Sequence, residues 1–215
     1  MKILFEYNQE KDVWCLINYG KTSMNSPIPT KMYQELISRC GEHSTNEQAV
    51  SFIDEYKNSN NLNEKDYVKR YTEDWLLIDE KYKEIAERVF GKSLHNDVIA
   101  YLTINNRCPY SIEDNMFFVQ MPAYSARKTS MHELWHFYTW QVFGKEWEDK
   151  LGKQKYNEIK EALTVLLNVE CKHLLPVRIT DNGYPQHKEL RKRILSLWEE
   201  EKDMQKLWNK LVTVS

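Results

Sequence analysis

The chain has 215 residues, of which 30 are basic and 32 acidic, giving a formal net charge of -2 at pH 7. This length is enough for one substantial hydrophobic core. The balanced charge, without a basic stripe carrying interleaved aromatic residues, gives no indication of a nucleic-acid partner. The N-terminus reaches charged residues too early for a signal peptide, and no apolar run approaches the length of a membrane span.

The cysteines favour a reducing compartment. They are scattered singly through the chain, at Cys15, Cys40, Cys108 and Cys171. This spacing matches neither the paired ligands of a zinc finger nor the density of a disulfide scaffold. We therefore expect free thiols in a cytoplasmic protein that has no membrane partner, and no feature specifies an oligomeric state.

The N-terminal part predicts a β-hairpin followed by helices. Residues 3–7 and 13–19 are rich in β-formers, and residues 8–12 resemble a turn. From residue 30 to about residue 90 the apolar residues recur at helical spacing, in segments of about 30–40, 44–57 and 64–90. Because these helices are also dense in charge, we expect them to form a solvated helical lobe.

The rest of the chain predicts two strands and three helices. The strands are residues 98–104 and 116–121, and Pro122 indicates that the second strand either ends there or lies at a sheet edge. An edge strand could bind an extended peptide, whereas an internal strand could not, and the sequence favours neither. Helices are predicted from Ser130 to Gly144, over about 154–175, and over 187–212, with a polar connection between the first two.

The segment His132-Glu133-Leu134-Trp135-His136 carries the predicted chemistry. In a helix, His132 and His136 lie one turn apart on the same face, so both imidazoles can reach one metal ion. Catalytic zinc uses three protein ligands and one water, and binding to zinc makes that water a nucleophile near neutral pH. Glu133 stands where it can take a proton from this water. Zinc is therefore the expected cofactor.

An alternative explanation of the same residues remains open. Ser130 and Glu133 have the spacing of a capping box, in which each side chain would bond to the backbone at the start of a helix. In that case the two histidines would be ordinary core or boundary residues. The metal interpretation is preferred because the surrounding helix is otherwise apolar, and buried polar groups need partners.

The third ligand is predicted from a polar stripe on the next helix. Glu161, Thr164 and Asn168 follow one another at steps of three and four residues along an otherwise apolar segment. Such a stripe needs polar groups to face, which a metal and its histidines would supply. Glu158 competes for the role but lies in the more polar opening of the helix, so Glu161 is preferred.

These residues resemble the gluzincin metallopeptidases, the thermolysin-like group, and the small size resembles the minimal cytosolic members of that clan. The resemblance covers about residues 116–168. It implies that His132, His136 and Glu161 bind zinc, that Glu133 is the general base, and that an edge strand binds substrate. Gluzincins commonly place an aspartate four residues after the ligand glutamate, where this chain has Val165. The pair Asn157-Glu158 resembles the asparagine-glutamate pair of that family, which keeps Glu158 open as a ligand.

The fold implied by the resemblance is α+β and zincin-like: a small mixed sheet with an active-site helix, a glutamate helix and a large helical complement. We expect one such domain over residues 1–215. It would comprise a helical lobe at about 28–92, a catalytic core at about 98–175 and a C-terminal helix at 186–213. A peptidase also needs a donor for the oxyanion of its intermediate, for which Tyr184 and His187 are the candidates.

The predicted function is zinc-dependent hydrolysis of peptide bonds, through a zinc-bound water activated by Glu133, on a peptide or protein substrate. Two alternatives remain at this stage. The first is a zincin-fold binding or regulatory protein with little hydrolysis, suggested by the missing aspartate after the glutamate. The second is a zinc hydrolase that acts on another amide.

Overall fold

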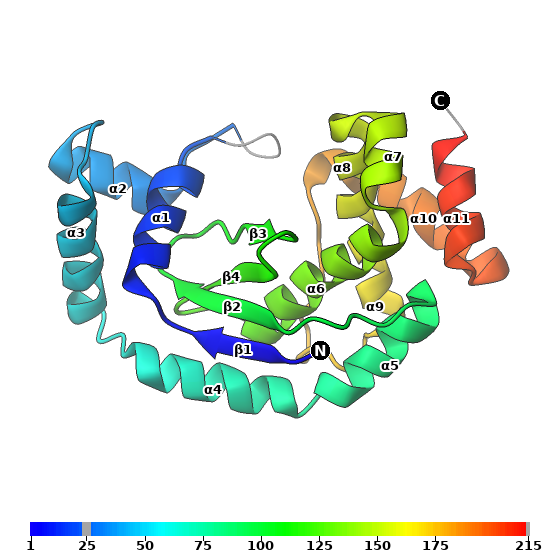
Figure 1. Ribbon diagram of the computed structural model, residues 1–215, viewed down its shortest axis with the longest axis horizontal. Helices are drawn as coiled ribbons and strands as arrows, with labels where there is room; N and C mark the ends of the chain where they lie inside the picture. The colour runs from blue at the N-terminus through cyan, green and yellow to red at the C-terminus, as the bar shows by residue number, and fades with distance from the viewer. Residues whose placement is uncertain (23–26, 214–215) are drawn as a thin grey trace. The chain divides into compact units, whose positions relative to one another are not determined.

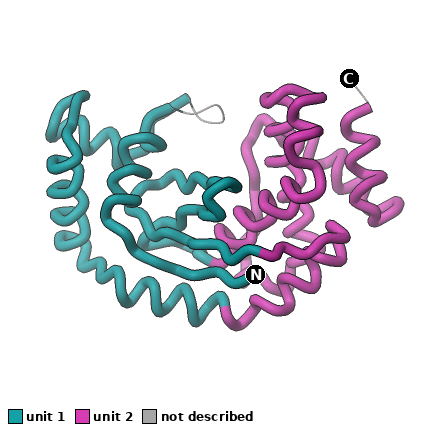
Figure 2. The backbone as a smooth tube through the Cα atoms, viewed as in Figure 1, with its two compact units in different colours: residues 1–75, 96–126 teal, residues 76–95, 127–215 magenta. Residues whose placement is uncertain are grey.

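The computed structural model describes residues 1–22 and 27–213 and shows a mixed α+β protein with a small sheet and mostly helical content (Figure 1). The chain forms two compact units (Figure 2). Unit 1 contains residues 1–75 and 96–126, and unit 2 contains residues 76–95 and 127–215. The predicted helical lobe and the predicted catalytic core are therefore both divided between the units. None of the described helices is long and apolar enough to span a membrane.

The elements have the following bounds. The strands are β1 (Ile3–Glu6), β2 (Val98–Thr103), β3 (Tyr110–Ser111) and β4 (Met116–Gln120). The first helices are α1 (Gln9–Tyr19), α2 (Lys31–Cys40), α3 (Asn46–Ser59), α4 (Glu64–Leu76) and α5 (Asp79–Phe90). After the sheet come α6 (Ala126–Phe143), α7 (Lys145–Leu151), α8 (Lys153–Leu163), the 3-10 turn η1 (Thr164–Leu166) and α9 (Leu167–Glu170). The chain continues with the 3-10 turn η2 (Pro185–His187), α10 (Lys188–Glu201) and α11 (Met204–Val212).

Unit 1 is built on the four-stranded mixed sheet, in the order β1-β2-β4-β3 (Figure 1). β2 runs parallel to both β1 and β4, and the short β3 pairs antiparallel with β4. Two neighbouring parallel strands need a long crossover connection, and the helical segment between β1 and β2 provides this connection. The two predicted strands 98–104 and 116–121 are confirmed as β2 and β4. β4 lies inside the sheet, with β2 on one side and β3 on the other.

The predicted hairpin at the N-terminus is wrong: residues 13–19 belong to helix α1. The side chain of Asn8 caps this helix by accepting a hydrogen bond from the backbone N–H of Lys11 at 3.1 Å. The residues that the helix buries are Asp12, Val13, Cys15 and Leu16, and Cys15 packs against Phe118 of β4. Burial against the sheet outweighs the β-propensity of this segment, which is a weak preference.

Asp12 ties α1 to the end of β2. Its side chain is fully buried, and one carboxylate oxygen accepts hydrogen bonds from the Thr103 hydroxyl at 2.6 Å and from the Ile104 N–H at 3.1 Å. The other oxygen, Oδ2, has no hydrogen-bond partner within the described part of the chain. Burial raises the pKa of Asp12 from 3.8 to about 6, although these hydrogen bonds oppose the change.

Unit 2 surrounds helix α6, which is apolar on nearly every side. Trp135 packs edge-on against Phe90 of α5, and the Tyr82 hydroxyl donates a hydrogen bond to the Met131 carbonyl at 2.8 Å. Near the other end of α6, Phe143 stacks on Trp208 of α11 with ring centroids 4.1 Å apart. A helix covered in this way is a core helix, and the polar side chains Ser130, Glu133, His136 and Thr139 that it carries are buried as well.

Ser130 is not the N-cap of this helix. α6 begins at Ala126, and Ser130 is a fully buried residue of its second turn. A capping box needs its serine just outside the helix, so the capping-box explanation of Glu133 is excluded. The helix predicted from residue 44 is α3, and Thr45 and Gln48 form a capping box at its start.

Four predicted segments differ from the structure: three long helices are each divided, and one connection contains a helix. The helix predicted over 64–90 is α4 and α5, and Asp79 and Glu80 open the second helix, where acidic residues favour an N-terminus. The helix predicted over 154–175 is α8, η1 and α9, and the final helix is α10 and α11, which separate at Lys202 and Asp203. The predicted polar connection after Gly144 contains the short helix α7.

We predict that the stability of Asp12→Asn relative to that of wild type increases as the pH rises. The native state holds the Asp12 proton up to a higher pH than the unfolded chain does, so wild type loses stability between the unfolded pKa of 3.8 and the native pKa of about 6. Denaturant unfolding of both proteins should show their free-energy difference changing by about 2 kcal/mol between pH 4 and pH 7. The exposed Asp66→Asn should show no comparable change, and a difference for Asp12→Asn that is independent of pH would contradict the prediction.

Candidate metal centre

Helix α6 brings two histidines together on one face. The Nε2 atoms of His132 and His136 lie 3.1 Å apart, and their rings meet edge-on with centroids separated by 4.7 Å. His136 is buried and His132 is nearly so. This is the arrangement expected for residues four apart in a helix, with one nitrogen of each ring directed to the same point.

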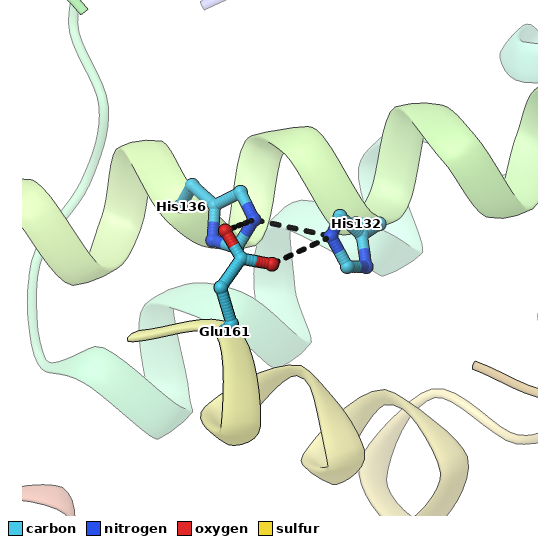
Figure 3. A group of neighbouring side chains, drawn as sticks. All are labelled: His132, His136 and Glu161. Atoms are coloured by element: carbon cyan, nitrogen blue, oxygen red, sulfur yellow. Dashed lines mark hydrogen bonds and ion pairs between the residues drawn. The ribbon is translucent and has the colours of Figure 1, made fainter. Parts of the chain in front are cut away.

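Glu161, on helix α8, completes the group (Figure 3). Its Oε2 atom lies 3.7 Å from Nε2 of His132, and its Oε1 atom lies 3.5 Å from Nε2 of His136. One ligand atom from each of the three residues lies within 4.8 Å of the other two, so the group could hold a metal ion. The structure thus brings together the three residues that the sequence predicts as ligands.

Glu158 is not part of this group. It lies one turn before Glu161 on α8, and its Oε1 atom accepts a hydrogen bond from the Gln154 side chain at 3.1 Å. This bond runs along the outside of the same helix. The burial argument that preferred Glu161 therefore agrees with the geometry.

Asp181 holds His132, and sequence reasoning missed it. Its Oδ2 atom lies 2.6 Å from Nδ1 of His132, and the residue is only 2% exposed. The other carboxylate oxygen accepts hydrogen bonds from the Thr164 hydroxyl at 2.8 Å and from Nη2 of Arg191 at 3.0 Å. A histidine that donates Nδ1–H to a carboxylate has its other ring nitrogen, Nε2, on the opposite side, where His136 and Glu161 lie.

Hydrogen bonds to the backbone of Asp181 hold the loop that carries this residue. Asn168 of α9 donates to the Asp181 carbonyl and accepts from the Asp181 N–H, both at 2.7 Å. Gly183 has φ +62, and a Cβ there would lie 2.5 Å from Nη1 of Arg191. Glycine is therefore needed for the guanidinium to pass and reach Asp181. The predicted polar stripe does face polar groups, since Thr164 and Asn168 both bond to Asp181.

The buried charges shift one another's pKa values. Burial alone would lower the pKa of His132, but Asp181 outweighs it and raises this pKa to about 10. Burial lowers the pKa of His136 to about 4. Burial would raise the pKa of Glu161, yet the two histidines hold it well below its usual range. Burial raises the pKa of Glu133 to about 7, against the opposing effect of His132.

The donor set fits a divalent cation. Two imidazole nitrogens and one carboxylate oxygen converge, and these are ligand types that zinc takes in catalytic sites. The carboxylate behind His132 is the usual outer partner of a metal-binding histidine. Glu133 is 7% exposed and belongs to the same helical turn, but it is not in the converging group.

The candidate oxyanion donors lie in the segment after Asp181. His187, in η2 just before α10, is 4% exposed, and its Nδ1 atom has no hydrogen-bond partner within the described residues. Burial lowers the pKa of His187, while Glu161 and Glu158 act in the opposite direction. Tyr184 packs edge-on against the His187 ring at 5.7 Å. His187 is thus a buried residue within the electrostatic reach of Glu161.

Lys160 is the second residue that sequence reasoning missed. A lysine near the polar opening of a helix is ordinarily solvated. In the structure it is buried, and its Nζ atom lies 3.1 Å from Oε1 of Glu161. A cationic side chain therefore belongs to the immediate surroundings of the metal-binding group.

Comparison with protein-family models, with curated proteins and with solved structures finds no significant match to this chain.

We predict that Asp181→Asn weakens metal binding by about 10- to 100-fold, because an amide in place of the carboxylate no longer fixes His132 with Nε2 free to bind. Chelator competition with zinc measures the affinity. Asn182→Ala is the matched control, since Asn182 is exposed in the same loop and bonds only to Thr180 among the interactions described. Equal zinc affinity in Asp181→Asn and wild type would show that the carboxylate does not position the ligand.

Proposed function

We propose that this protein is a zinc-dependent metallopeptidase of the gluzincin type with a zincin-like fold. The proposed ligands are His132, His136 and Glu161. The observation that carries the proposal is the convergence of two imidazole nitrogens and one carboxylate within 4.8 Å of one another, with Glu133 in the same helical turn. Two histidines and one glutamate are a donor set that catalytic zinc uses in peptidases, which supports zinc over other divalent ions.

Bound zinc would supply a Lewis acid that polarises the scissile carbonyl and makes a water molecule more acidic. Glu133 would act as general base: one carboxylate oxygen takes a proton from the attacking water and then delivers it to the nitrogen of the leaving amine. Because the Glu133 side chain is buried, little bulk water competes for this proton. His187 offers a ring nitrogen that could donate to the oxyanion, with Tyr184 packed against it.

A binding or regulatory function without hydrolysis loses its main support. That alternative rested on the absence of an aspartate four residues after Glu161, where Val165 stands. Asp181 supplies a carboxylate beside the first histidine, His132, from a loop instead of from the glutamate helix. Hydrolysis of an amide other than a peptide bond would use the same residues, so the substrate screen described below includes such compounds.

The metal ligands are tested by elemental analysis. We predict one zinc ion per chain in the purified wild type, loss of the metal in Glu161→Ala, and retention in Glu158→Ala. The two variants remove the same group one helical turn apart, so a non-specific effect of losing a carboxylate is controlled. Absence of zinc from wild type after incubation with the metal would exclude the proposed function. Loss of zinc in Glu158→Ala but not in Glu161→Ala would show that Glu158 is the third ligand in place of Glu161.

The general base is tested with Glu133→Gln. This change keeps the size and the buried position but removes the proton acceptor, so we predict zinc content equal to wild type and turnover reduced by at least about 10²-fold. Turnover is followed by mass spectrometry on a peptide library and, in parallel, on a panel of amide metabolites. Full activity of Glu133→Gln would contradict the mechanism, whereas cleavage confined to the metabolites would leave the mechanism but change the substrate class.

A further inference from the structure

Lys160 is a buried cation that the mechanism above does not use. The residue is 5% exposed, and its Nζ atom lies 3.1 Å from Oε1 of Glu161. The same oxygen lies 3.5 Å from Nε2 of His136, so it is one of the atoms directed at the metal position. The charge of Lys160 also acts on Glu133 and His136. The ammonium group therefore lies beside the reacting centre.

Burying a lysine in this place costs free energy, and a function in binding would explain why the residue is there. Removing an ammonium from water is expensive, and the interaction with a carboxylate compensates only in part. A dication held by Glu161 would compete with Lys160 for the same oxygen and would repel the ammonium. The arrangement therefore weakens metal binding, and burying an apolar side chain there would avoid this cost.

The charge of the site shows what the ammonium could bind. The buried side chains of the site comprise three carboxylates, those of Glu133, Glu161 and Asp181, and two cations, Lys160 and Arg191. With neutral histidines and a bound dication, one positive charge remains in excess. Arg191 is engaged by Asp181 at 3.0 Å, whereas Lys160 contacts the proposed metal ligand Glu161 directly at 3.1 Å. Such a site is complementary to one negative charge close to Glu161.

We propose that Lys160 is a catalytic residue that binds the oxyanion formed during hydrolysis of a peptide bond. This inference rests on the proposed function. The water oxygen forms a bond to the carbonyl carbon, the π electrons of the carbonyl move to its oxygen, and one water proton passes to Glu133. As Glu133 loses its negative charge, the substrate oxygen gains one, and the Lys160 ammonium turns from Glu161 to this oxygen.

The oxyanion then collapses. The C–N bond breaks, Glu133 returns its proton to the nitrogen, and the remaining acidic proton of the new carboxylic acid also goes to the amine. The products are a carboxylate and an ammonium, Glu133 recovers its negative charge, and Lys160, which stays protonated throughout, returns to Glu161. A donor with a full positive charge binds the oxyanion more strongly than a neutral imidazole such as His187 would.

The experiment measures anion binding beside the metal, without turnover. Wild type, Lys160→Met and Lys153→Met are loaded with Co²⁺, and the visible absorption of the bound cobalt is titrated with inorganic phosphate at constant ionic strength. Lys153 is an exposed lysine on the same helix, so its variant controls for the general loss of positive charge. Chelator competition gives the cobalt affinity of each protein.

We expect phosphate to bind Lys160→Met at least about tenfold more weakly than wild type, because a hydrogen bond to a charged group is lost. Lys153→Met should match wild type, and Lys160→Arg should recover part of the affinity. Cobalt itself should bind Lys160→Met at least as tightly as wild type, since a competing cation is removed. If Lys160→Met does not fold, Lys160→Gln takes its place in the same titration.

Each other outcome has a distinct meaning. Equal phosphate affinity in wild type and Lys160→Met, or no phosphate binding to cobalt-loaded wild type, would overturn the assignment of Lys160 and leave the metal site standing. Failure of wild type to bind cobalt would overturn the proposed function, and with it this inference. If a cleaved peptide is available, Lys160→Met should lower kcat by about 10²-fold while KM stays within about threefold.

Discussion

Buried charge is the constraint on which unit 2 depends. Helix α6 is covered on nearly every side, and it carries His132, Glu133 and His136 into that core. An isolated carboxylate in such surroundings would be strongly disfavoured, so each buried acid must have cationic or donor partners. Asp181 meets this requirement with Arg191 and His132, and Glu161 meets it with the two histidines and Lys160. These pairings join α8 and the loop after α9 to helix α6.

The sequence was most informative where the spacing is local. His132, Glu133 and His136 lie within five residues, so helical geometry alone predicts that both imidazoles lie on one face. Glu161 could be selected because a polar stripe on an apolar helix indicates a polar environment. Both inferences use only the periodicity of one helix. The structure brings the same three residues together, although they come from two separate helices.

Residues positioned by loops could not be found in this way. Asp181 lies 17 positions beyond Thr164 in an irregular segment, and no periodic pattern connects it to His132. The sequence offers one indirect indication: Val165 occupies the place where the resembled family has an aspartate, so a carboxylate would have to come from elsewhere in the chain. Lys160 was missed for a different reason, since a lysine at the polar opening of a helix is ordinarily solvated. Similarly, the β-formers of residues 13–19 do not reveal that Asn8 caps a helix that packs on the sheet.

The two units stabilise buried carboxylates in different ways, and the difference indicates their roles. Asp12 in unit 1 is held by a hydroxyl and a backbone N–H, which do not offset its burial, so its pKa rises and the neutral form is favoured. Asp181 in unit 2 is equally well buried, but His132 and Arg191 hold its pKa well below the usual range and keep it charged. A carboxyl group that only joins α1 to β2 can be neutral and still accept the hydrogen bonds that make this connection. A carboxylate that must orient a metal-binding imidazole has to remain ionised, and a fixed cation behind it maintains that state. The guanidinium of Arg191 is therefore as much a requirement of the proposed metal centre as the aspartate that it contacts.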